Sequence, residues 1–184
     1  MSALNRLFAG RSARTFVIAV VLSLAAPAFG AAAGASTLTA GEQAYARHDY
    51  ARAAPLLRAE AERGSPDAQT YLGYMYLNGF GVPQDFVVAA GWLNQAAQQG
   101  QPTAQFLLGM AFDKGQGVPQ DWVQAETWLI LATSQAGSRE RDYWARIRDA
   151  VAQKLTLDQL AEARRRAYFW AMPVHRGGAF SARF

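Results

Sequence analysis

Few residues of this sequence have the types and spacing that chemistry requires. The 184 residues include no cysteine and only two histidines, His48 and His175, which excludes disulfide scaffolds, thiolate metal sites, cysteine nucleophiles and His-rich metal centres. His48 and Asp49 have the composition of a base with an orienting carboxylate, but neighbours at a helix start rarely face each other. Glu60 and Glu62 lie two residues apart, on different faces of a helix. We therefore predict no catalytic residue, no metal and no cofactor.

A glycine-containing segment, Gly79-Phe80-Gly81, has the spacing of a loop that cradles phosphate. It lacks the lysine that should follow it and the strand that should precede it. The same spacing returns at Gly115-Gln116-Gly117. The recurrence favours a structural turn over a binding loop.

The recurrence belongs to a duplication of 36 residues. When 64–99 is aligned with 100–135 without gaps, 18 of 36 positions are identical. Below we call 64–99 the first repeat and 100–135 the second repeat. Such a repeat is one supersecondary unit that buries its apolar side by stacking on its neighbours.

Each repeat predicts two helices joined by a short connection. Pro66 suits the first position of a helix, Gly79 ends that helix, and Asp85 caps the next one. Gly73 is a poor helix former, yet it returns as Gly109. We expect a neighbouring helix to approach this position so closely that a Cβ atom would clash.

Atypical helix pairs flank the two repeats. Thr39 with Glu42, and Thr156 with Gln159, have the spacing of a capping box at a helix start. The pattern predicts eight helices in four hairpins, an all-α fold of the α-solenoid type. The predicted parts are a signal peptide (1–35), an N-terminal hairpin (36–63), two repeats (64–99 and 100–136), C-terminal capping helices (137–172) and a flexible tail (173–184).

The first 35 residues have the composition of a secretory signal peptide. Three arginines precede an apolar run from Phe16 to Ala26, and small residues follow as far as Ala35. The run is short for a membrane span, which needs about 20 residues. We expect export to a periplasm or the exterior; an uncleaved anchor is the alternative.

Charge is distributed unevenly along the chain. The net charge of +4 includes three arginines of the leader, so the basic balance does not indicate a nucleic-acid partner. Residues 36–138 contain 5 basic and 9 acidic side chains, and residues 139–184 contain 10 and 5. Two readings stay open, a polar docking surface or two ordinary solvated faces. The run Arg164-Arg165-Arg166 fits the negative end of a helix.

The residues shared by the two repeats resemble the Sel1-like repeat, a relative of the tetratricopeptide repeat. The pattern is A-x-x-x-L-G-x-x-Y-x-x-G-x-G-V-x-x-D-x-x-x-A-x-x-W-x-x-x-A, from Ala68 to Ala96, and the second copy differs by Phe112 for tyrosine. The resemblance implies a superhelix of antiparallel hairpins and an adaptor or scaffold role. Its partner is expected to be a protein or peptide.

The resemblance also implies a concave groove lined by the first helix of each pair. The positions expected to contact a partner peptide or helix are Asp67, Thr70, Tyr74, Asn78, Thr103, Phe106, Met110 and Asp113. A groove covered by the basic terminal hairpin is an equally open alternative. A different class of function, a cell-envelope hydrolase acting on peptidoglycan or β-lactams, is the second hypothesis.

Overall fold

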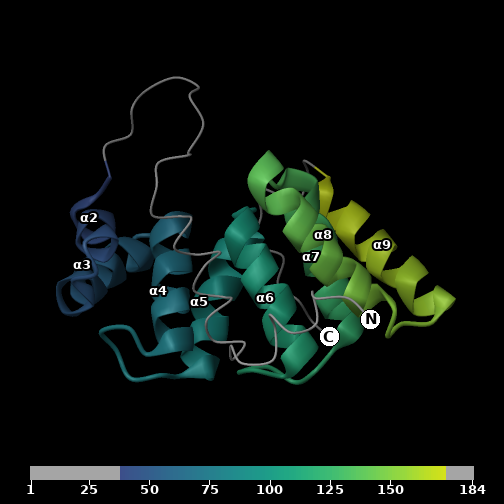
Figure 1. Cartoon of the computed structure of the whole chain (residues 1–184), viewed down its shortest axis with the longest axis horizontal. Coiled ribbons are helices and arrows are strands. Elements are labelled where there is room, and N and C mark those ends of the chain that lie inside the picture. The colour runs from purple at the N-terminus through teal and green to yellow at the C-terminus, as the bar shows by residue number, and fades with distance from the viewer. Residues whose placement is uncertain (1–37, 173–184) are drawn as a thin grey trace, which may run out of the picture. The chain divides into compact units, whose positions relative to one another are not determined.

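The structure, a computed structural model, describes residues 38–172, which form eight α-helices and no strand (Figure 1). These eight helices belong to one compact unit that begins at Thr39. The predicted signal peptide and tail lie outside the described residues. The helices are α2 (Ala40–Ala46), α3 (Tyr50–Glu62), α4 (Pro66–Asn78), α5 (Phe86–Gln98), α6 (Pro102–Lys114), α7 (Trp122–Gln135), α8 (Ser138–Ala152) and α9 (Leu157–Ala171).

The helix starts follow the capping signals of the sequence, with one exception. Both capping boxes form, at Thr39 with Glu42 and at Thr156 with Gln159. Asp85 accepts hydrogen bonds from the backbone N–H groups of residues 87 and 88, at 2.9 and 3.0 Å. The exception is α8. Ser138 is its first helical residue, and Gly137 stands at the N-cap position without a side-chain hydrogen bond.

A repeating contact between paired helices builds the core. A Cβ atom added at Gly73 would lie 2.7 Å from Leu93 Cγ, and one at Gly109 would lie 2.9 Å from Leu129 Cγ. The expected close approach at these glycines is therefore confirmed. Gly41 of α2 meets Leu57 of α3 in the same way, at 2.9 Å. The N-terminal hairpin thus packs as a third copy of the unit, although its connection is shorter.

The connection of each repeat packs on the second helix of the preceding pair. A Cβ atom at Gly81 would lie 2.3 Å from the carbonyl oxygen of Tyr50, and one at Gly117 would lie 1.9 Å from that of Phe86. Tyr50 and Phe86 are 36 residues apart, as are the two glycines. This contact fixes how one unit stacks on the next.

The last two helices do not form the fourth hairpin that the sequence predicts. Both α8 and α9 pack on α7, and α9 packs there rather than against α8. The small side chains of Ala163 and Ala167 are buried, and the Thr127 hydroxyl, which donates to the Val123 carbonyl oxygen at 2.7 Å, lies 3.4 Å from the Ala163 carbonyl oxygen. Because alanines let two helices approach closely, α9 can lie directly on α7.

Candidate functional site

The groove residues predicted in the first repeat are largely engaged within their own helix. The Thr70 hydroxyl donates to the Pro66 carbonyl oxygen at 2.7 Å, and Asn78 Nδ2 donates to the Tyr74 carbonyl oxygen at 2.8 Å. Tyr74 is 4% exposed. Asp67 is half-buried and accepts a hydrogen bond from Gln101 Nε2 at 3.4 Å.

The groove residues predicted in the second repeat meet the C-terminal helices instead. Phe106 is 6% exposed and stacks on Trp144 of α8, with ring centroids 4.9 Å apart. Asp113 forms an ion pair with Lys154 at 2.5 Å. Thr103 and Met110 are half-buried. At Phe106, the surface is therefore covered by α8, and the partner-binding role of all these residues stays a prediction.

Four tyrosines gather at the N-terminal side, on α2, at the start of α3 and on α4, and we call Tyr45, Tyr50, Tyr71 and Tyr74 the tyrosine face. The ring centroids of Tyr45 lie 5.4 Å from Tyr50 and 4.8 Å from Tyr71. Phe80 links the others, because it stacks on Tyr50 at 4.7 Å and meets Tyr74 at 6.0 Å. Tyr45, Tyr50 and Tyr71 are half-buried, so their rings border both core and solvent.

The electrostatic environment of the tyrosine face is acidic. Burial raises the pKa of Tyr71, and the negative charges of Glu42 and Asp67 raise it further. Burial also raises the pKa of Tyr74, to about 12, with a smaller contribution from Tyr50. Both hydroxyls are therefore neutral donors at physiological pH, and the Tyr71 hydroxyl lies in the field of two carboxylates.

The tyrosine face belongs to the first repeat and its N-terminal neighbour, and the second repeat lacks it. The corresponding positions differ in chemistry, although the contact between glycine and leucine of the paired helices is the same in both repeats. The pairs are Tyr71 and Leu107, Tyr74 and Met110, Phe80 and Gln116, and Asp67 and Thr103. The sequence analysis singled out Tyr74 and Asp67 but missed Tyr45, Tyr50 and Tyr71. Comparing the positions at which the two copies differ would have found Tyr71.

Comparison with known proteins gives the family. A model of the Sel1 repeat matches residues 66–101 and 102–136. The chain belongs to the Sel1 repeat family. A protective antigen of uropathogenic Escherichia coli strains, which displays an SLR fold, is 29% identical with a TM-score of 0.66 over 78% of this chain. The chain spans about a third of that protein, 32% of its length. A Sel1 repeat protein from Oxalobacter formigenes is 38% identical over 52% of this chain and 71% of its own, with a TM-score of 0.48. A search among curated proteins finds no match.

Membership of the Sel1 repeat family limits the classes of function to be considered. Sel1 repeats are typically protein–protein interaction modules, and the family generally acts as a non-catalytic scaffold. Within residues 38–172, no group of His, Asp and Glu side chains is arranged to hold a metal ion. In the same range, no helix is both long and apolar enough to cross a membrane.

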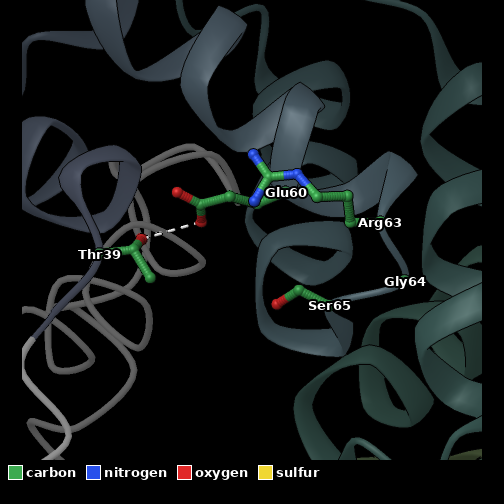
Figure 2. A pocket seen from close by; sticks show the side chains of 5 residues that line it. All are labelled: Thr39, Glu60, Arg63, Gly64 and Ser65. Carbon is green, nitrogen blue, oxygen red and sulfur yellow. Dashed lines mark hydrogen bonds between the residues drawn. The ribbon is translucent and has the colours of Figure 1, made fainter.

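The carboxylates considered for catalysis are dispersed in this Sel1 repeat protein. Figure 2 shows an open pocket where α3 gives way to α4, lined by Thr39, Glu60, Arg63, Gly64 and Ser65. The Thr39 hydroxyl donates to Glu60 Oε2 at 2.9 Å, and Glu62 is not among the lining residues. His48 and Asp49 have separate partners: His48 Nδ1 is 2.8 Å from the Tyr50 hydroxyl, and Asp49 caps α3. The structure therefore does not bring either pair together.

Buried glutamines form a second feature that the sequence analysis missed. Gln69 Nε2 donates to the Ala61 carbonyl oxygen at 3.0 Å, and Gln105 Nε2 donates to that of Ala97 at 3.2 Å. These side chains satisfy backbone groups at the ends of α3 and α5. Their identity in both Sel1 repeats is the signal that could have revealed them.

Proposed function

We propose that this Sel1 repeat protein is an exported interaction module that binds a peptide or helix of a partner protein on the tyrosine face, without catalysis. The observation that carries the proposal is the tyrosine face itself. Half-buried tyrosines give a large contact area at low cost in side-chain entropy, and they are enriched at protein interfaces. Tyr45, Tyr71 and Tyr74 lie on the first helices of their pairs, which the resemblance to related solenoids implies as the binding side, and Tyr50 begins the second helix α3.

Position-specific cross-linking tests where the partner binds. A photoreactive p-benzoyl-phenylalanine replaces Tyr71 in one form of the protein and Val87 in another. Val87 of α5 is 68% exposed and lies on a second helix, which makes it a matched control. Irradiation in envelope extracts should attach a defined partner at position 71 and none at position 87. Equal labelling at both positions would contradict the proposed site.

Cell fractionation tests the proposed export. The chain from which the predicted signal peptide (1–35) has been removed should appear in the fraction that osmotic shock releases. A product in the membrane fraction that keeps the mass of residues 1–35 would replace this view with an anchored scaffold. Hydrolysis of a chromogenic β-lactam or of muropeptides by the pure protein would contradict the absence of catalysis.

A further inference from the structure

We propose that the tyrosine face recognises a basic segment of its partner, with an arginine or lysine side chain against the rings beside Glu42 and Asp67. The inference rests on the proposed function and adds the chemistry of the partner. It is argued from the rings, the carboxylates and the contrast between the two repeats.

The rings offer the surface that a flat cation prefers. Tyr45, Tyr50, Tyr71 and Phe80 form a connected series with centroid separations of 4.7 to 5.4 Å. A guanidinium group stacks on such a ring face, and an ammonium group is attracted by it. The attraction is larger where water is excluded than at an exposed site.

Two carboxylates supply the complementary charge. Glu42 is half-buried in the first turn of α2, and Asp67 is half-buried in the first turn of α4. Glu42 precedes Tyr45 by three residues on α2, and Asp67 precedes Tyr71 by four residues on α4, so each carboxylate lies on the same helix face as a ring of the tyrosine face. Glu42 accepts a hydrogen bond from the Thr39 backbone, and Asp67 accepts one from a neutral glutamine amide. These hydrogen bonds leave the negative charge of each carboxylate in place.

The second repeat has the same helical scaffold but lacks the tyrosine ring and the carboxylate. Leucine stands at the position of Tyr71, and threonine at that of Asp67. The carboxylate of Asp113, in the last turn of α6, is neutralised by Lys154 of the same chain. Of the two repeats, the first, together with its N-terminal neighbour, is therefore the one that offers a basic partner segment both tyrosine rings and carboxylates without an ion-pair partner among the described residues.

Binding of short peptides to the full mature chain tests the inference. Fluorescently labelled octapeptide pools with arginine, citrulline or glutamate fixed at the centre are titrated and followed by anisotropy. Citrulline keeps the shape of arginine and removes its charge. The arginine pool should bind at least tenfold more tightly than the citrulline pool and should weaken as salt is added.

A variant that copies the second repeat, Tyr71→Leu with Asp67→Thr, should lose this preference for arginine. Glu62→Gln is the matched control, because it removes one exposed carboxylate outside the tyrosine face. Helicity and the unfolding midpoint establish that both variants are folded; if the double variant is not, Asp67→Asn alone replaces it.

Three results would overturn the inference. They are equal affinity for arginine and citrulline, an unchanged preference in the variant that copies the second repeat, and a cross-linked product at position 71 that is a second copy of this chain. A partner cross-linked at position 71 without any preference for arginine would leave the proposed function standing and reject only the basic segment. Failure of both experiments would reject both.

Discussion

The two Sel1 repeats of this protein share a core and differ on their surface. Gly73 and Leu93 in the first repeat pack as Gly109 and Leu129 do in the second. Around this common core, the first repeat presents tyrosines, whereas the second is covered at Phe106 by Trp144. The identical residues include those that pack the paired helices together. The differing residues give the first repeat the proposed binding surface, and they give the second repeat the surface that α8 covers.

We expect the largest effect on stability where Trp144 of α8 covers the second repeat. Trp144 is 4% exposed and stacks on Phe106, while the first repeat has Thr70 at that position. Trp144→Ala should cost about 3–5 kcal/mol in the free energy of unfolding, as for other large buried aromatic side chains. Urea denaturation followed by circular dichroism measures the cost.

Trp144→Phe is the control for that substitution. It keeps a ring over Phe106 and removes the indole Nε1, which is buried without a hydrogen-bond partner among the described residues. We expect a much smaller loss than for Trp144→Ala. A similar loss for both variants would mean that stacking on Phe106 is not the source of the stability.

The shared core predicts equal effects at equivalent glycines. Gly73→Val and Gly109→Val should each destabilise the fold by about 3 kcal/mol, because the new side chain meets a leucine and a backbone carbonyl of the paired helix. The midpoint of chemical unfolding measures this. Gly91→Ala is the control, since Gly91 of α5 has open space around its Cβ position. That substitution should stabilise the protein by up to about 1 kcal/mol. If the two valine substitutions lowered the stability by strongly unequal amounts, the two glycine positions would not be equivalent.

A buried carboxyl group, Glu126, distinguishes the second repeat from the first. Glu126 of α7 is 4% exposed, and its Oε2 has no hydrogen-bond partner within the described residues; the first repeat has Ala90 there. Burial raises the pKa of Glu126 from 4.5 to about 7, although Arg148 and Arg164 oppose the shift and Asp149 adds to it. The folded protein thus retains a proton that the unfolded chain releases.

Stability should therefore fall as pH rises from about 4.5 to about 7 and should be level, with respect to this group, above that range. The fall is on the order of 3 kcal/mol, because the pKa rises from 4.5 to about 7 and each unit of pKa corresponds to about 1.4 kcal/mol. Thermal unfolding across this pH range measures it. Glu126→Gln keeps the shape of the side chain and should remove this part of the pH dependence. An unchanged pH profile in that variant would show that another group is responsible.

The smallest effect is expected at the ion pair between the second repeat and the α8–α9 connection. Lys154 is 40% exposed while its partner Asp113 is 14% exposed. Such pairs contribute about 1 kcal/mol or less. Lys154→Met should lower the free energy of unfolding by that amount, and the difference should shrink in high salt. A loss of several kcal/mol would mean that the ion pair holds the closing helices in place.

The sequence predicted the features that recur from one repeat to the next, and it missed the features that occur in only one part of the chain. Asp85, Gly73 and the two capping boxes specify local geometry, so they placed the helices to within a residue or two. The packing of α9 on α7 could not be predicted, because the buried alanines of α9 are small enough to suit either neighbour. Tyr45 and Tyr71 were missed for a related reason: they lie far apart in sequence, and only the pairing of α2 with α4 joins their rings.

Hydrogen–deuterium exchange tests the division between the two repeats most directly. The mature chain is compared alone and with the partner that is cross-linked at position 71. The account predicts slower exchange on binding in 40–50 and 66–80, with no change in 102–114. Equal protection of 102–114, or protection there alone, would contradict the assignment of binding to the first repeat.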